Sequence, residues 1–205
     1  MHYSKPYAEY QSMALTFPIV CFGGSAVDLD EYTQLLGALP ADLDVAFVII
    51  DNLKQVARVL HDSLSKCTKM PVDFITDGLA VQRNHVFVLQ EGHDLHIIDG
   101  AFHLAPKSKP TGWPDVITVF LRSLTTHWPG QLIAVILAGY DGDGAAALCG
   151  VKDVGGITIA QKVDTARQQD MPLSAIASGC VDFILPIDEI AKEIVRIAHA
   201  SRLEV

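Results

Sequence analysis

Continuous runs of apolar residues alternate along this chain with segments whose apolar residues recur every three or four positions. The runs Phe17–Phe22, Val45–Ile50 and Leu132–Ala138 are almost wholly apolar, which is typical of parallel strands that are buried on both faces of a sheet. Two shorter strands are expected at Ile157–Ala160 and Asp182–Leu185. This rhythm predicts an α/β fold with a doubly wound, mostly parallel sheet.

Helices are expected after most of these strands, because their apolar residues gather on one face. The first carries Leu29, Tyr32, Leu35 and Leu36 and ends near Gly37, and Asp28 and Asp30 lie in its first turn. A second helix, over Val56–Leu64, presents Val56, Val59, Leu60 and Leu64 on one face. Later helices are expected from Trp113 through Leu124, after Gly144, over Pro172–Ala177 and over Ile187–Ala200.

The middle of the chain has a different pattern, with short β segments separated by turn residues. The segments are Val72–Ile75, Val86–Leu89, Leu95–Ile98 and Ala101–Leu104, and the turns are Asp77-Gly78, Gly92 and Asp99-Gly100. Such spacing is typical of hairpins, so this section predicts a small antiparallel hairpin insertion. Residues 1–16 are expected to form an N-terminal extension, and residues 17–205 one domain.

Composition narrows the class of protein. The chain has 205 residues, half of them hydrophobic, with a net charge of −9 and a mean hydropathy of +0.29. No apolar run approaches a membrane span, and no basic stripe offers a nucleic-acid surface. The polar N-terminus lacks a secretory signal.

The four cysteines are scattered, with no C-x-x-C spacing for zinc and no disulfide framework. Cys21 and Cys149 lie in apolar or small-residue segments, where a buried thiol acts as a small hydrophobe. We therefore expect a cytoplasmic protein without metal or cofactor.

Ser25 is the candidate nucleophile, because it follows the first strand directly behind Gly23 and Gly24. The carboxyl ends of parallel strands are where ligands bind in open α/β sheets. A structural alternative is that Ser25 caps the next helix, with Asp28 at the capping-box position. Spacing alone favours this cap, since the hydrolase elbow expects glycine where this chain has Val27.

A second glycine-rich loop, Gly139-Tyr140-Asp141-Gly142-Asp143-Gly144, follows the Leu132–Ala138 strand. One of its aspartates would cap a helix that begins near Ala145. Alternatively, an aspartate orients a catalytic histidine while the loop backbone supplies an oxyanion donor. The Asp-x-Asp-Gly pattern also resembles the opening of a calcium loop, but the later ligands and the closing glutamate are missing.

A general base is not evident from the sequence. None of the eight histidines follows an expected parallel strand; they are His2, His61, His85, His93, His96, His103, His127 and His199. The second strand ends instead in Asp51-Asn52. Asp51 could serve as a surrogate base only if its pKa were strongly raised.

Several motifs in order give the chain a resemblance to a known family. They are Phe22-Gly23-Gly24-Ser25, Ala46–Ile50, Thr68-Lys69-Met70-Pro71-Val72, Asp77-Gly78, His85–Val88, Val135–Gly139, Gly142-Asp143-Gly144, Gln161 and Met171–Ile176. From about Phe17 to Ala200, the chain resembles the catalytic domain of the chemotaxis protein-glutamate methylesterases, the CheB family. It is most similar to versions found in methylesterase–methyltransferase fusions.

The resemblance implies a doubly wound α/β domain that hydrolyses methyl esters of glutamate side chains on receptor signalling helices and releases methanol. Some members of the family also deamidate glutamine there. By position, Ser25 matches the nucleophile and Asp143 the aspartate that orients the histidine. The backbone N–H groups of Ala26 and Tyr140 match the oxyanion positions. The implied partners are methylated chemoreceptor-like helices or another signalling protein.

Three departures from the family pattern bear on activity. Asn52 stands at the position of the family histidine, and an amide is not a useful base. The family's Ser-x-Gly-Gly is Ser25-Ala26-Val27-Asp28 in this chain. In the second loop, Tyr140 stands where the family has an aliphatic or small residue, and Asp141 adds a charge. The alternative to an active esterase is therefore a catalytically degenerate domain that serves as a binding or regulatory module.

Overall fold

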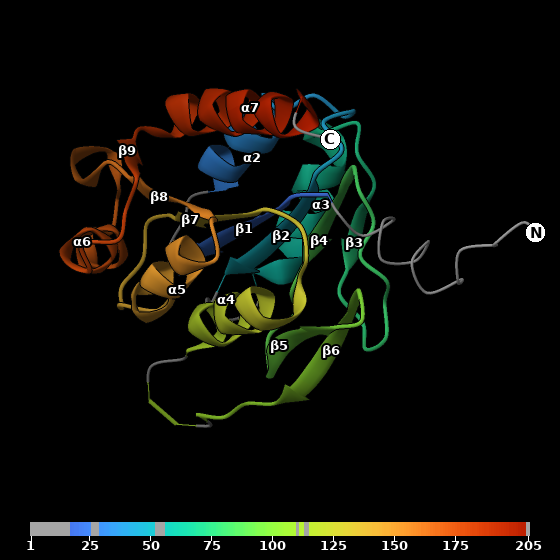
Figure 1. Cartoon of the computed structure of the whole chain (residues 1–205), viewed down its shortest axis with the longest axis horizontal. Helices are drawn as coiled ribbons and strands as arrows, with labels where there is room; N and C mark the ends of the chain where they lie inside the picture. Colours follow the sequence, from blue (N-terminus) through green and yellow to red (C-terminus); the bar gives the residue numbers. More distant parts are fainter. Residues whose placement is uncertain (1–16, 26–28, 52–55, 110, 113–114, 204–205) are drawn as a thin grey trace, which may run out of the picture.

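The computed structural model describes residues 17–25, 29–51, 56–109, 111–112 and 115–203. Within these residues, seven strands form a parallel sheet in the order β3-β4-β2-β1-β7-β8-β9, as Figure 1 shows. The strands are β1 (Ile19–Gly24), β2 (Ala46–Asp51), β3 (Val72–Phe74), β4 (His85–Val88), β7 (Leu132–Ile136), β8 (Ile157–Gln161) and β9 (Phe183–Leu185). The predicted α/β class and parallel sheet are confirmed.

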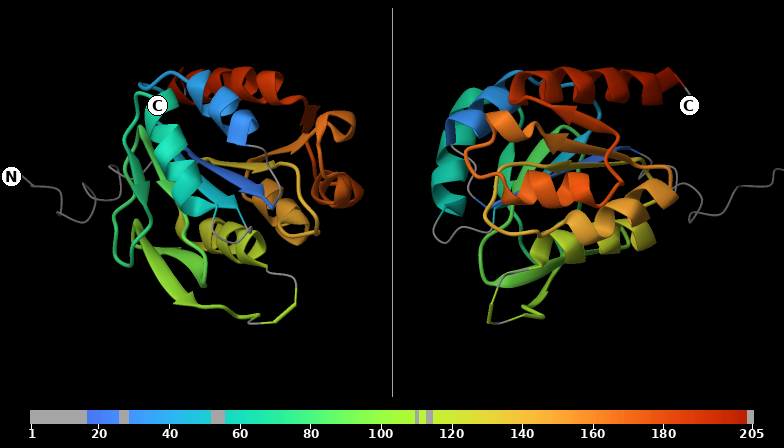
Figure 2. Two further views of the ribbon diagram at one scale, coloured as in Figure 1. Left: turned by 180° about the vertical axis from the view of Figure 1, so that it is seen from behind. Right: turned by 90° about the vertical axis from the view of Figure 1, so that its left-hand side faces the viewer.

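Helices cover both faces of the sheet (Figures 1 and 2). One face packs against α2 (Leu29–Gly37), α3 (Ala57–Cys67) and α7 (Ile187–Leu203). The other packs against α4 (Val116–His127), α5 (Leu148–Asp153) and α6 (Asp170–Ala177). Two short 3-10 helices, η1 (Ala145–Ala147) and η2 (Val163–Thr165), lie in the connections. The sheet is therefore doubly wound.

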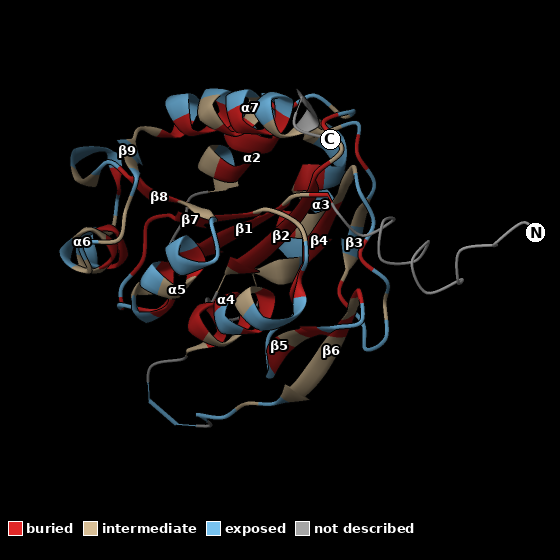
Figure 3. Cartoon of the chain, viewed as in Figure 1, coloured by how far each residue is buried: buried red, intermediate tan, exposed pale blue. Residues whose placement is uncertain are grey.

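The two helical layers explain why the central strands are continuously apolar. All six residues of β1 are buried, and the sheet forms the buried centre in Figure 3. Because successive side chains of a strand point to opposite faces, Ile19 and Cys21 pack in the core on the α4 side. Val20 and Phe22 pack in the core on the α2 side.

The chain changes direction across the sheet at β1. From β1 it winds outward through β2 to the β4 side, and from β7 it winds through β8 to β9. Such a switch point opens a crevice at the carboxyl ends of the two central strands, where ligands bind. Ser25 follows β1 and the loop 139–144 follows β7, so both candidate loops lie at this crevice.

The predicted antiparallel insertion is smaller than the sequence pattern indicated. β3 and β4 belong to the parallel sheet, with β4 paired to β2. The antiparallel pair is β5 (His93–Ile98) with β6 (Ala101–Pro106), and it packs on α4. Its tight turn is Asp99-Gly100, as predicted, and both residues have positive φ, 51° and 79°.

Two smaller predictions were wrong. Val59 is 53% exposed rather than packed with its helical neighbours, because the face of α3 that packs on the sheet is centred on the buried Leu60 and Leu64. Cys149 is exposed and forms a disulfide with Cys180, so it is not a buried thiol, and the expectation of cysteines without disulfide pairing does not hold for these two. Among the described helices, none is long and apolar enough to cross a membrane. The predicted N-terminal extension lies outside the described residues.

Candidate active site

The Ser25 side chain is held at the junction of the two glycine-rich loops. Ser25 is 4% exposed, and its backbone N–H donates to the Ala138 carbonyl at 3.1 Å. The Tyr140 N–H donates to Ser25 Oγ at 2.9 Å, and the hydroxyl donates to Met171 Sδ at 3.4 Å. The predicted meeting of the two loops at one sheet edge is therefore observed.

The cap interpretation of Ser25 is not tested by these contacts. An N-cap would accept a bond from the first turn of the following helix, and residues 26–28 lie outside the described residues. The described partners of Ser25 Oγ come from the loop after β7 and from α6. The hydroxyl thus contacts elements that are distant in sequence from Ser25.

Two glycines allow this close approach. A Cβ on Gly23 would lie 2.8 Å from Ile117 Cγ2 of α4. A Cβ on Gly139 would lie 2.6 Å from Ser25 Oγ and would collide with the Met171 sulfur. Larger residues here would push α4 or α6 away from the serine.

The Gln161 side chain holds the segment that follows β7. Its side chain is fully buried, and its Oε1 accepts the Ala138 N–H at 2.9 Å. Its Nε2 donates to Glu31 Oε1 and to the Thr165 carbonyl, both at 3.3 Å. Gln161 thereby holds Ala138, the residue whose carbonyl accepts the Ser25 N–H. Residue chemistry alone did not single out Gln161; the family resemblance named it without a role.

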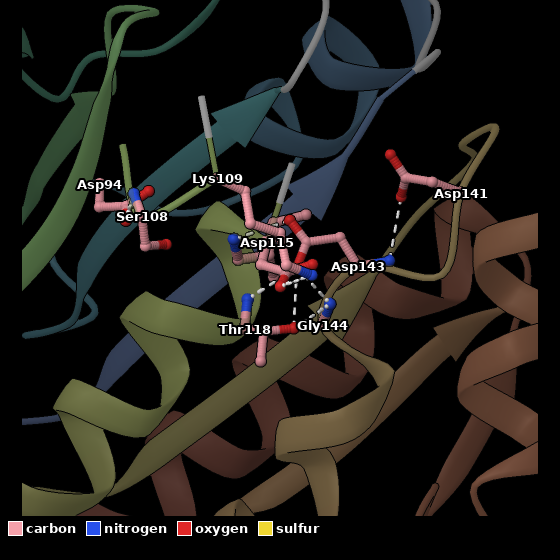
Figure 4. A network of polar contacts seen from close by, with 9 residues as sticks. Asp94, Ser108, Lys109, Asp115, Thr118, Asp141, Asp143 and Gly144 are labelled. Carbon is pink, nitrogen blue, oxygen red and sulfur yellow. Dashed lines mark hydrogen bonds and ion pairs between the residues drawn. The ribbon is translucent and has the colours of Figure 1, made fainter. Parts of the chain in front are cut away.

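The Asp143 carboxylate binds the first turn of α4 (Figure 4). It is 4% exposed. Its Oδ2 accepts the Ile117 N–H at 2.9 Å, and its Oδ1 accepts the Thr118 N–H and hydroxyl at 2.9 and 2.8 Å. The Gly144 N–H also donates to Oδ1, at 2.8 Å.

An aspartate of this loop does cap a helix, but that helix is α4 rather than one near Ala145. Asp115, the residue that precedes α4, makes no side-chain cap bond and pairs with Lys109 instead. A carboxylate at a helix N-terminus is favoured by the unpaired N–H groups and by the helix dipole. Gly144, which precedes η1, has φ 88° and supplies no side-chain cap.

Asp141 is the less satisfied of the two loop aspartates. It is 9% exposed, and its Oδ1 accepts the Asp143 N–H at 3.0 Å. Its Oδ2 is buried without a hydrogen-bond partner among the described residues. Burial raises the pKa of this carboxyl, the Asp143 N–H lowers it, and the neighbouring carboxylate charges raise it further.

These contacts do not support the calcium-loop interpretation. The carboxylates of Asp141 and Asp143 face backbone N–H donors, whereas a calcium ligand must direct its oxygens at the ion. Across the described ranges, no group of three His, Cys, Asp or Glu side chains is arranged to hold a metal ion.

Asp51 lies on the opposite face of the sheet from Ser25 Oγ. The Tyr32 hydroxyl, on the α2 side, donates to Asp51 Oδ2 at 3.4 Å. Burial, and then the Asp51 charge, raise the pKa of Tyr32 well above its usual range. On the α4 side, burial and then Asp143 raise the pKa of the Cys21 thiol, which therefore stays protonated.

The described histidines do not lie at the carboxyl ends of the parallel strands. His85 is the first residue of β4, His93 and His96 belong to β5, and His103 belongs to β6. His61, His127 and His199 lie on helices. Ala26 and Asn52, the predicted oxyanion and base positions, lie outside the described residues.

Comparison with known proteins agrees with this geometry. The model of the CheB methylesterase family matches residues 20–194. A protein-glutamate methylesterase/protein-glutamine glutaminase of Burkholderia thailandensis is 29% identical over 187 residues, 90% of this chain and 55% of the relative. One of Cupriavidus pinatubonensis is 33% identical over 187 residues, 90% of this chain and 54% of the relative. The chain thus spans about half the length of these relatives.

A solved structure extends the likeness to three dimensions. The crystal structure of the Thermotoga maritima CheB methylesterase catalytic domain superposes with a TM-score of 0.80 and 25% sequence identity. The match covers 87% of this chain and 97% of that domain.

Proposed function

Since this chain belongs to the CheB methylesterase family, we propose that it hydrolyses methyl esters of glutamate side chains, with Ser25 as the nucleophile. The observation that carries the proposal is the Tyr140 N–H, 2.9 Å from Ser25 Oγ at the central crevice of the sheet. A backbone donor beside a buried hydroxyl suits acyl transfer, because negative charge develops on the substrate oxygen next to the nucleophile.

In this mechanism Ser25 Oγ attacks the ester carbonyl carbon, and methanol leaves from the resulting tetrahedral intermediate. The N–H of Tyr140, together with that of Ala26, is assigned to the oxyanion. Water then hydrolyses the acyl-serine and leaves a glutamate side chain. Gln161 supports the geometry through Ala138, whose carbonyl receives the Ser25 N–H.

The role proposed for Asp143 is positioning. Its carboxylate accepts bonds from α4 and from Gly144, so it ties the loop after β7 to the helix beside Ser25. Asn52 is assigned no proton-transfer role, since a carboxamide is not basic at neutral pH.

The proposed partners are methylated signalling helices of chemoreceptor-like proteins, and the proposed location is the cytoplasm. A net charge of −9 does not favour nucleic acid as a partner.

Methanol release from methylated receptor fragments tests the proposal. We expect release by the unaltered chain and its loss in Ser25→Ala, by a factor on the order of 10³ or more. A fluorophosphonate probe should label Ser25 in the unaltered chain only. If neither release nor labelling occurs, the chain is the degenerate binding module instead.

A further inference from the structure

A serine esterase needs a group that accepts the hydroxyl proton, and by the resemblance to the family Asn52 stands at the position of its histidine in this chain. The described partners of Ser25 Oγ are a backbone N–H and the Met171 thioether. An N–H cannot accept a proton, and a thioether is only a weak hydrogen-bond acceptor. Turnover therefore requires another acceptor near the serine.

Two nearby carboxylates are unsuited to this task. Asp51 is bound by Tyr32 on the α2 side of the sheet, whereas Ser25 Oγ contacts Met171 on the α6 side. Asp143 faces the right side, but both of its oxygens accept bonds from the first turn of α4. Protonating it would break the helix cap.

Asp141 is the remaining carboxylate of this loop, and it lies next in the chain to a residue that contacts Ser25. It follows Tyr140, whose N lies 2.9 Å from Ser25 Oγ. Standard backbone dimensions then keep the Asp141 Cα within about 8 Å of that oxygen. A carboxyl group and one bridging water can span such a distance.

The hydrogen bonding of Asp141 leaves one oxygen for this purpose. Oδ1 is fixed by the Asp143 N–H at 3.0 Å, and Oδ2 is buried without a partner in the described part of the chain. Figure 4 shows this carboxylate beside the Asp143 backbone and apart from the α4 bonds. An unpaired buried carboxylate oxygen is costly, so its presence here calls for a functional explanation.

The surroundings also adjust the basicity of Asp141 in the useful direction. Burial raises its pKa, and the Asp143 N–H bond opposes this rise. The carboxylates of Asp143, Asp115 and Asp170 then raise the pKa further, while Lys109 pairs with Asp115. A raised pKa makes a carboxylate a stronger base near neutral pH.

We propose that Asp141 is the proton acceptor for Ser25 and takes the place of the missing histidine, directly or through one water. This inference rests on the proposed esterase function. As the Ser25 Oγ–carbon bond forms, the hydroxyl proton passes to Asp141 Oδ2. As the carbon–methoxy bond breaks, that proton passes to the leaving oxygen and methanol departs. The attacking water later gives its proton to Asp141, which returns it to Ser25 Oγ as the acyl bond breaks.

The test compares methanol release by the full chain with that by Asp141→Asn. This substitution keeps the size and the Oδ1 acceptor but removes the base. We expect kcat to fall by about 10²–10⁴-fold, the usual contribution of general base catalysis, with KM little changed. The rate of methanol release by the unaltered chain should rise with pH as Asp141 ionises, and the rate of Asp141→Asn should not show this rise. Asn52→His added to Asp141→Asn should restore turnover, because it supplies the family base.

The matched control is Asp153→Asn, an exposed aspartate at the end of α5, which should retain full activity. If Asp141→Asn stays within threefold of the unaltered chain while Ser25→Ala is inactive, Asp141 is not the base and the esterase proposal stands. If the unaltered chain releases no methanol and Asn52→His does, the Asp141 proposal is overturned. If neither releases methanol, the proposed function fails as well.

Discussion

Replacing Asp143 by alanine is expected to destabilise the fold, because the carboxylate caps α4. The substitution leaves the Ile117 and Thr118 N–H groups without an acceptor; both donate to the Asp143 carboxylate at 2.9 Å in a buried region. Each buried donor left without an acceptor costs about 1–3 kcal/mol. The Gly144 N–H also loses Asp143 Oδ1 but keeps the Thr118 hydroxyl as an acceptor, at 2.8 Å. The expected total for the two unpaired donors is therefore about 2–6 kcal/mol.

Urea unfolding, followed by circular dichroism, measures this loss, and the melting temperature should fall by roughly 10 °C for a chain of this size. Asp115→Ala is the matched control, since Asp115 precedes α4 without a side-chain cap bond. It loses only its exposed ion pair with Lys109, which contributes about 0–1 kcal/mol. If Asp143→Ala costs no more than Asp115→Ala, the capping argument is refuted.

Two further predictions concern the framework around Ser25. Gln161→Leu should reduce fluorophosphonate labelling of Ser25 at least tenfold, because the Ala138 N–H loses its acceptor; labelling at the original rate would contradict this positioning role. The Cys149–Cys180 disulfide, with a sequence separation of 31, should contribute about 3–4 kcal/mol to stability by loop closure. Thiol titration in denaturant should then find two free thiols without reductant and four with it, whereas four in both conditions would exclude the bond.

The central part of the fold was predictable because its signals are local. β1 and β7 are apolar along their whole length, and β2 is apolar up to its last residue, Asp51, since helices cover both faces of each strand. Ser25 and the loop 139–144 both follow such strands. Parallel winding then brings the two loops to the same edge of the sheet.

The strand pairing in the middle of the chain was mispredicted, because a short apolar segment does not reveal whether its strand will pair in a parallel or an antiparallel direction. β4 joins the parallel sheet through its pairing with β2, and the Asn84 N–H anchors this pairing on the Val45 carbonyl at 2.7 Å. Those partners lie about forty residues apart in the sequence. The pairing of Cys149 with Cys180 is likewise set by how α5 and the segment before β9 pack.

The two aspartates of the loop after β7 illustrate how far residue spacing can assign roles. In Asp141-Gly142-Asp143 the carboxylates are chemically identical, and the family resemblance assigns the catalytic part to Asp143. The structure distinguishes them by their hydrogen bonds. Asp143 accepts bonds from N–H groups at the N-terminus of α4, whereas Asp141 has a buried oxygen without a partner among the described residues. Because the α4 cap is needed whether or not a histidine is present, Asp143 is expected in active and inactive forms alike. Its presence is therefore no evidence of catalysis, and the proposed activity rests on Ser25 and Asp141.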